Sequence, residues 1–124
     1  MQRVFQQSYH IPGTLTADLN IRFTAPFDMQ LIHVSAVASN DSDALLTVGD
    51  SDDADEYVVS AVIGDSAVPV ETEADTFVDT AGATHGRHYP RIADGKVVVI
   101  ALDYDGDGGT AADDVTIVLT FTEG

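Results

Sequence analysis

The sequence predicts a single all-β domain, an antiparallel β-sandwich of jelly-roll type with about eight short strands. Three observations predict it: apolar residues recur with a period of two, turn-forming residues separate the apolar runs, and 124 residues suit one domain with its own core. The domain is expected to fill residues 1–124. Residues 1–17 are expected to form either an arm that pairs with a neighbouring subunit or an edge strand.

Two alternating runs predict the first strong strands. Residues 19–24 alternate apolar and polar side chains, and the pair Ala25-Pro26 then interrupts the ladder. A second strand is expected over residues 29–38. The side chains expected to share its apolar face are Ile32, Val34, Ala36 and Ala38.

Three further strands follow from turns and apolar runs. An Asx-rich turn at residues 40–43 precedes a short strand over residues 45–49. Residues 96–102 are apolar on both faces, which predicts a central strand. The last strand alternates most regularly, and its inward side chains are expected to be Val115, Ile117, Leu119 and Phe121.

Weaker patterns predict short strands over residues 4–11, 68–70, 76–78 and 87–92. Residues 52–63 are open to two interpretations. Apolar residues four apart and acidic residues at the start favour a helix. The β-branched residues of the same stretch favour a loop that leads into a strand.

The charge is strongly acidic, with 21 Asp and Glu against 5 Lys and Arg, a formal net charge of −16. Nucleic acids and anionic membranes are therefore not expected as partners, since both require basic clusters. Asp far outnumbers Glu, and Lys96 is the single lysine. This balance favours a halophilic host, because molar salt shortens the screening length to about 3 Å and removes the self-repulsion of such a chain. The alternative is an acidic protein from an ordinary source that charge keeps soluble.

The chain contains no cysteine, which excludes disulfides, thiolate metal sites and cysteine nucleophiles. The first ten residues lack the apolar core of a signal peptide, and no run approaches the roughly 20 apolar residues of a membrane span. A mature, soluble chain without a cleaved signal is expected.

The segment DYDGDGGTAADD over residues 103–114 has the spacing of a calcium loop. Carboxylates at loop positions 1, 3, 5 and 12 are the candidate ligands, namely Asp103, Asp105, Asp107 and Asp114. Position 12 is Asp instead of the longer Glu, and the flanking segments are strands instead of helices. The segment is therefore either a site for calcium or another cation, or an acidic Gly-rich hairpin loop. No cofactor is required in either case.

A second acidic cluster lies over residues 50–56 and follows no ligand template, so a solvated face is expected there. The sequence THGRHYPR, in contrast, concentrates positive charge in an acidic chain. Arg and Tyr are enriched at interface hot spots, so a docking surface for an acidic partner is expected before a histidine metal site. Its candidate residues are Arg87, His88, Tyr89 and Arg91. An ordinary loop whose arginines balance nearby carboxylates is the alternative.

Catalytic patterns are absent from the sequence: there is no G-x-S-x-G motif, P-loop or dinucleotide fingerprint. The many carboxylates are better explained by salt adaptation than by acid–base chemistry. We therefore expect no catalytic residues and no enzymatic activity.

The stretches APFDMQLIHVSAVAS and VVVIALDYDGDGGTAADDVTIVLTFTEG resemble small all-β structural proteins of tailed viruses, in particular capsid decoration proteins. The resemblance covers the second strand and the final hairpin and rests on pattern and size. It implies a non-enzymatic β-sandwich or jelly roll, often a homotrimer, that binds the major capsid protein or another virion protein. It also implies assembly in the host cytoplasm and a place on the capsid surface of the virion. With the acidic composition, the host would be a halophilic archaeon.

An alternative from another class is a cation-binding β-sandwich that serves as an adhesion or carbohydrate-binding module. Such modules brace a loop with a cation and stack exposed aromatic rings on sugars. The chain has no tryptophan, which weighs against a sugar platform.

Overall fold

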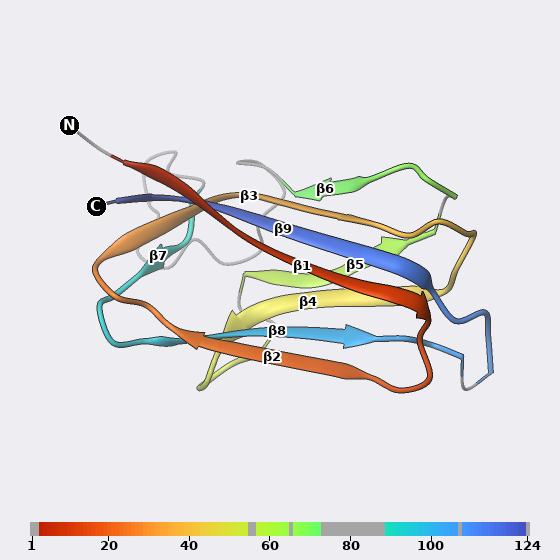
Figure 1. The fold of residues 1–124 in the computed structure, drawn as a ribbon. Helices are drawn as coiled ribbons and strands as arrows, with labels where there is room; N and C mark the ends of the chain where they lie inside the picture. Colours follow the sequence, from red (N-terminus) through yellow and green to blue (C-terminus); the bar gives the residue numbers. More distant parts are fainter. Residues whose placement is uncertain (1–2, 55–56, 65, 73–88, 107, 124) are drawn as a thin grey trace.

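The computed structural model describes residues 3–54, 57–64, 66–72, 89–106 and 108–123, and its strands form two facing antiparallel sheets (Figure 1). The five-stranded sheet has the order β1-β9-β3-β6, and β7 also pairs with β3. Its strands are β1 (Val4–Thr14), β9 (Asp113–Glu123), β3 (Met29–Val37), β6 (Val70–Thr72) and β7 (Arg91–Ile92). The four-stranded sheet has the order β2-β8-β4-β5. Its strands are β2 (Leu19–Thr24), β8 (Val97–Asp103), β4 (Ala44–Asp50) and β5 (Val58–Ile63).

The path of the chain between these sheets is that of a jelly roll. The chain changes sheet after β1, β2 and β3, stays in one sheet for the β4–β5 hairpin, and changes again before β6, β8 and β9. As a result, the first and last strands lie side by side, and β1 pairs with β9 from Val4 opposite Thr122 onward. The predicted all-β antiparallel sandwich is confirmed.

The core lies between the two sheets and is built from alternate residues of each strand. In β9 the four predicted inward side chains, from Val115 to Phe121, are fully buried. In β8 the side chains of Val98, Ile100 and Leu102 enter the core, while Val99 is buried on the opposite side. The strand β8 lies between β2 and β4, so its predicted central position is confirmed.

An aromatic cluster joins the two sheets at one end of the core. Phe121 of β9 stacks on Phe5 of β1, with ring centroids 5.2 Å apart and planes at 22°. It also meets Phe23 of β2 edge to face at 5.8 Å and 81°. Phe27 packs edge to face on Phe5 at 5.5 Å. Because Phe23 belongs to the other sheet, Phe121 is a direct contact between the layers.

The inward face of β3 differs from the prediction in one respect. Ile32 was expected beside Val34 and Ala36, but it is half-buried, and Leu31 is fully buried instead. The reason is a register shift against β9 between Leu31 and His33. One extra residue in a strand reverses the alternation of side chains on either side of it.

The helix considered for residues 52–63 is wrong where the structure describes this stretch. Residues 58–63 form β5, which pairs with β4 through Leu45 opposite Val62 and Leu46 opposite Ala61. Pairing along β4 satisfies the backbone of these β-branched residues and places Ile63 in the core. The alternative of a loop that leads into a strand is confirmed.

Of the weaker predicted strands, the first is confirmed and two others are displaced or shorter than predicted. Residues 4–11 lie within β1, an edge strand whose one described neighbour is β9. The run predicted at residues 68–70 overlaps the strand β6 only at Val70, because β6 lies two residues later. The run predicted at residues 87–92 is a strand only at Arg91 and Ile92, which form β7, and its first two residues lie outside the described residues. The run at residues 76–78 lies outside the described residues. The described part of the chain contains no helix long and apolar enough to span a membrane.

Candidate functional site

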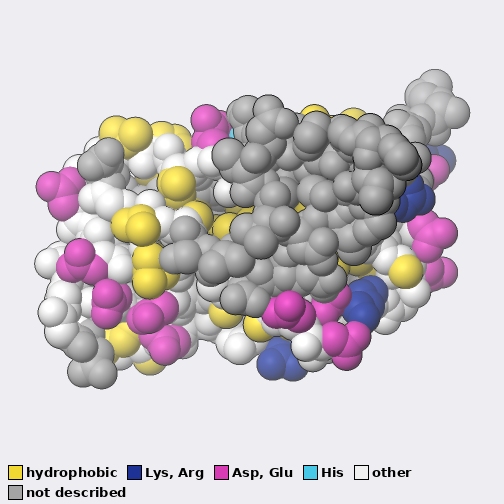
Figure 2. Space-filling model, turned by 180° about the vertical axis from the view of Figure 1, so that it is seen from behind, with side chains coloured by type: hydrophobic (Ala, Val, Ile, Leu, Met, Phe, Trp, Pro, Cys, Tyr) yellow, Lys and Arg dark blue, Asp and Glu magenta, His cyan; other side chains and the backbone are white. Residues whose placement is uncertain are grey.

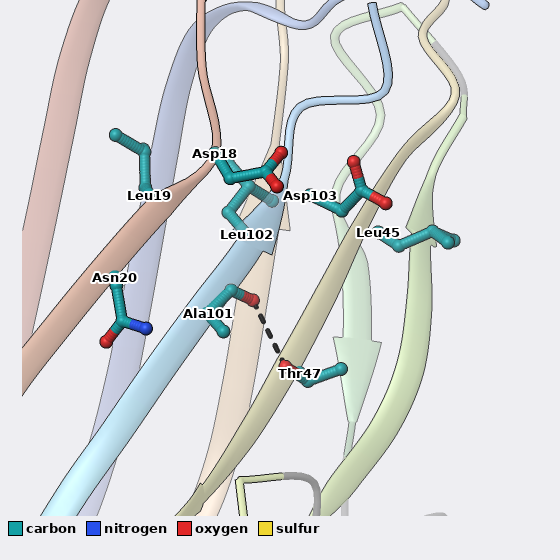
Figure 3. A pocket seen from close by; sticks show the side chains of 8 residues that line it. All are labelled: Asp18, Leu19, Asn20, Leu45, Thr47, Ala101, Leu102 and Asp103. Carbon is teal, nitrogen blue, oxygen red and sulfur yellow. Dashed lines mark hydrogen bonds between the residues drawn. The ribbon is translucent and has the colours of Figure 1, made fainter. Parts of the chain in front are cut away.

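A shallow groove of about 330 Å³ crosses the outer face of the four-stranded sheet (Figure 3). Strands β2, β8 and β4 supply its lining, which consists of Asp18, Leu19, Asn20, Leu45, Thr47, Ala101, Leu102 and Asp103. Ala101 lies opposite Asn20 on one side and Thr47 on the other. Because its side chain is short, it forms the floor of the groove. The Thr47 hydroxyl donates to the Ala101 carbonyl over 3.3 Å.

Two carboxylates stand at one end of the groove, where β2 begins and β8 ends (Figure 3). The Asp18 carboxylate accepts the backbone N–H of Tyr104 over 3.1 Å. The Asp103 carboxylate accepts the backbone N–H of Asp105 over 3.0 Å. Both side chains therefore fix the start of the loop after β8. The groove offers oxygen acceptors above an aliphatic floor, and its lining residues include no aromatic ring on which a sugar could stack.

The structure separates the predicted cation ligands into two groups. Asp103 and Asp105 lie together at the start of the loop, and Asp105 has a positive φ of 45°. Asp114 lies at the start of β9, where its carboxylate accepts the N–H of Gly13 over 2.7 Å and the hydroxyl of Ser39 over 3.0 Å. Asp107 lies outside the described residues. Among the residues that the structure does describe, no three His, Asp or Glu side chains are grouped to hold a metal ion.

The same acidic loop is braced by residues from the β3–β4 connection. The Asp43 carboxylate accepts the N–H of Thr110 over 2.7 Å. The Asn40 side chain donates to the Ala111 carbonyl and accepts the Asp113 N–H, each over 2.9 Å. These bonds replace the missing strand partners of the loop backbone. The loop is thus held in place by the protein's own side chains.

The described part of the basic segment lies beside the five-stranded sheet. Tyr89 is 39% exposed, and Arg91 opens β7, opposite Gln30 of β3. Arg91 also borders a hollow of about 220 Å³ together with Asp28, Ile92 and Ala93. The other two predicted docking residues, Arg87 and His88, lie outside the described residues. The structure therefore brings Tyr89 and Arg91 to one margin of the sandwich.

Asp50 is a residue whose importance the sequence did not indicate. It was grouped with the solvated acidic cluster, but its side chain is buried, with 4% of the residue exposed. One carboxylate oxygen accepts the N–H groups of Asp52 and Asp53 over 2.9 and 3.0 Å. The other accepts the hydroxyl of Tyr57 over 3.2 Å and lies 3.8 Å from Nζ of Lys96. The expectation of a solvated face is therefore wrong for Asp50 and holds for Asp52 and Asp53, which are exposed.

The turn that Asp50 organises lies tightly against the preceding glycine. A Cβ atom at Gly49 would come within 2.1 Å of the Asp53 carbonyl oxygen and 2.4 Å of the Ala54 carbonyl carbon. Glycine is therefore required at this position so that the turn can fold back over the strand. Glycine followed by Asx-turn residues at a strand end was the available sequence signal.

Accepting backbone N–H groups is a general use of aspartate in this protein. At least seven described aspartates do so, namely Asp18, Asp28, Asp41, Asp43, Asp50, Asp103 and Asp114. The short Asp side chain suits this task because it reaches a loop N–H group without extending into solvent. Part of the excess of Asp over Glu thus has a structural explanation that does not depend on salt.

Asp114 makes the acid stability of the fold testable. The Gly13 N–H bond and then the Ser39 hydroxyl bond lower the pKa of the Asp114 carboxyl below its usual 3.8, with His10 adding a smaller effect. A lowered folded-state pKa gives stability above the unfolded pKa that is lost as pH falls through the folded one. We therefore expect the stability advantage of the protein over Asp114→Asn to be constant above about pH 5 and to narrow below 3.8. Urea unfolding between pH 3 and 6, about the range of this transition, measures it.

Asp94→Asn is the control for that measurement, because Asp94 is exposed and the variant loses the same single charge. If the free energies of unfolding of Asp114→Asn and of the unchanged protein changed in parallel down to low pH, the lowered pKa of Asp114 would be contradicted. Asparagine tolerates the positive φ of 49° at this position, so backbone strain does not confuse the comparison.

Comparison with known proteins gives similarities of fold only. No protein-family model and no curated protein sequence matches the chain. One similar solved structure is described as "Cyanophage Pam1 capsid asymmetric unit", with 19% identity, a TM-score of 0.48, and coverage of 99% of this chain and 85% of that chain. Another is described as "CBM4 structure and function", with 15% identity, a TM-score of 0.33, and coverage of 91% and 77%.

Proposed function

We propose that this chain is a non-enzymatic structural protein of a virion that decorates and stabilises the capsid of a tailed virus of a halophilic host. The observation that carries the proposal is how the protein uses its reactive side chains. Seven described aspartates accept loop N–H groups, and Asp50, the buried carboxylate among the described residues, is surrounded by donors. Carboxylates used in this way hold loops in place instead of acting on a substrate, which suits a structural component of a shell.

The fold is compatible with this role but does not decide it. Jelly rolls occur in viral capsid proteins and also in lectins and cupins, so fold alone assigns no function. The sequence stretches that resemble decoration proteins correspond to β3 and to the β8–β9 region. These strands include the two central strands β9 and β3 of one sheet and β8, one of the two central strands of the other. The resemblance therefore concerns the part of the chain that defines the sandwich.

The acidic surface supports the halophilic part of the proposal. Seen from behind, acidic side chains are spread over the described surface and basic ones are few (Figure 2). In molar salt the screening length is about 3 Å, so attachment to a shell depends on short-range hydrogen bonds and apolar contact. Many weak contacts of that kind add up on a particle with repeated sites.

We place the contact with the major capsid protein, or another virion protein, at the basic segment. Tyr89 and Arg91 contribute an exposed ring and an exposed strand residue at one margin of the sheet, and Arg87 and His88 precede them in the chain. A carboxylate on the shell protein would complete the contact, since guanidinium and carboxylate groups pair through two hydrogen bonds. Association of several copies of the chain would strengthen attachment further.

Replacing Arg87 and Arg91 together with alanine is expected to reduce occupancy on purified shells at least about tenfold, because losing two charge-assisted contacts costs more than about 1.4 kcal/mol. Quantitative mass spectrometry of shells incubated with the purified protein in molar salt measures occupancy. Arg22→Ala is the matched control, since Arg22 is an exposed arginine on β2 of the other sheet. Unchanged occupancy of the double variant, with an unchanged circular dichroism spectrum, would refute this docking site.

The groove favours a second candidate, a cation-binding adhesion or carbohydrate-binding module. Its two carboxylates and the Asn20 amide could bind sugar hydroxyls, directly or through a cation held by the loop that begins at Asp103. A glycan array probed in molar salt, with and without calcium, tests this function. Glycan binding that Asn20→Ala removes would support the second candidate over the first.

A further inference from the structure

Between the ends of β9, the outer face of the strands β1, β9 and β3 carries no formal charge. Its residues, which we call the uncharged face, are Val4, Gln6, Ser8, His10, Thr116, Val118, Thr120, Thr122, Gln30, His33, Ser35 and Val37. They form four rows across the sheet, such as Gln6–Thr120–His33 and Ser8–Val118–Ser35. Every one of them is exposed or half-buried.

The absence of carboxylates is specific to this face. The chain has a net charge of −16, and the outer face of the four-stranded sheet carries Asp18, Arg22 and Asp103. Among the described residues, the charges next to the uncharged face lie at its edges. Asp114 and Glu123 lie at the ends of β9, Glu71 of β6 pairs with His33 over 3.2 Å, and Arg91 of β7 lies opposite Gln30. An acidic protein thus keeps the outward positions of three adjacent strands, between the ends of β9, free of Asp, Glu, Lys and Arg.

The edge strand β1 supports the same conclusion. Its residues, VFQQSYHIPGT, include no Asp, Glu, Lys or Arg, although charge is the usual protection of an exposed edge against pairing. Pro12 and the positive φ of Gly13 disturb only the last part of the strand. Over Val4 to Ile11 the strand pairs regularly with β9, and Val4 is 64% exposed.

The net charge of the chain indicates which kind of partner binds such a face. A cationic partner would be attracted to the carboxylates elsewhere on the protein, whereas a partner as acidic as this chain can approach only where carboxylates are absent. A second copy of the chain is that partner. The Thr, Ser, Gln and His side chains both donate and accept hydrogen bonds, so the face is complementary to itself in a twofold arrangement.

We propose that the uncharged face is a contact surface between two copies of this chain. This inference does not rest on the shell-binding function, although Arg91 of the basic segment lies opposite Gln30 at the border of the uncharged face. Twelve residues are fewer than the roughly 20–30 per side of a standard interface, so the contact is weak by itself. Salt strengthens it, because screening removes the repulsion between the remaining charges of two −16 chains.

Sedimentation velocity of the full chain from dilute to molar sodium chloride tests the proposal. We expect a monomer in dilute salt and self-association in molar salt, with Thr120→Glu raising the dissociation constant at least about tenfold, since it buries an unpaired carboxylate in the contact. Thr24→Glu is the matched control: it creates the same net charge on an exposed residue of β2 in the other sheet. It should leave self-association unchanged.

A chain that stays monomeric under all these conditions would overturn the inference, as would an oligomer that both variants weaken equally. If Thr120→Glu lowers the thermal stability, Gln6→Glu replaces it, because Gln6 is exposed on the edge strand and changes little in size. Shell occupancy is measured in a separate experiment with the arginine variants. Failure of self-association therefore leaves the proposed function standing, and failure of shell binding leaves this contact standing.

Discussion

Replacing Phe121 with alanine is expected to lower the free energy of unfolding by about 3–5 kcal/mol, a large share of the stability of a domain this size. The Phe121 side chain is fully buried, stacks on Phe5 and meets Phe23 of the opposite sheet edge to face. The substitution leaves a cavity between the layers and removes both ring contacts, each of which adds about 0.5–1.5 kcal/mol beyond burial. Urea unfolding followed by circular dichroism in molar salt measures the loss.

Val118→Ala is the control for Phe121→Ala, because Val118 lies on the same strand but is half-buried on its outer side. Its loss of stability should stay below about 1 kcal/mol, since little apolar surface is uncovered. If Phe121→Ala proved no more harmful than Val118→Ala, the contact between the sheets at this aromatic cluster would not be a main source of stability.

Asp50→Ala is expected to cost about 3 kcal/mol, the range for removing one partner from a buried charged network. The substitution leaves the N–H groups of Asp52 and Asp53, the Tyr57 hydroxyl and the Lys96 ammonium without this acceptor. The turn against Gly49 should loosen at the same time. The same urea unfolding experiment measures the effect.

Asp52→Ala separates the buried network from the surface ion pair. The Asp52 carboxylate lies 2.5 Å from Nζ of Lys96, but its side chain is 79% exposed, so its loss should cost less than about 0.5 kcal/mol. Equal costs for the two variants would mean that the pairing with Lys96, and not the burial of Asp50, holds the turn together.

The sequence was sufficient to predict the strands in which the alternation of inward and outward residues does not depend on distant parts of the chain. From Val115 to Phe121, β9 places every second, apolar residue in the core. β8 is apolar on both sides, with Val98 and Ile100 in the core and Val99 buried on the outer side. Such patterns depend on which face of the strand each residue occupies, and this face follows from the position of the residue in the strand. The bulge in β3 was not predictable in this way, because it depends on the register of Leu31 and His33 against a distant strand.

The acidic residues show where sequence patterns stop being informative about a site. Asp50 and Asp52 are two positions apart and chemically identical, yet one is buried and the other exposed. Asp114 has the spacing of a loop ligand, but its carboxylate binds Gly13, 101 residues away in the sequence. The spacing of residues within one loop cannot reveal a hydrogen-bond partner that the fold brings from the other end of the chain. The calcium loop stays a prediction, and so does the docking role of the basic segment.

The pairing of β1 with β9 also determines how the protein could be fused to other proteins or circularly permuted. The start of β1 and the end of β9 lie at the same side of the sandwich, where the Glu123 N–H donates to the Arg3 carbonyl over 2.9 Å (Figure 1). Because these strands are antiparallel neighbours, a hairpin turn of about two residues could join them and permit a circular permutant. A fluorescent tag or antigen fused at either end would project away from the side where β2 begins and β8 ends. The groove and the acidic loop would stay accessible on such a fusion, which makes the fold a scaffold for display.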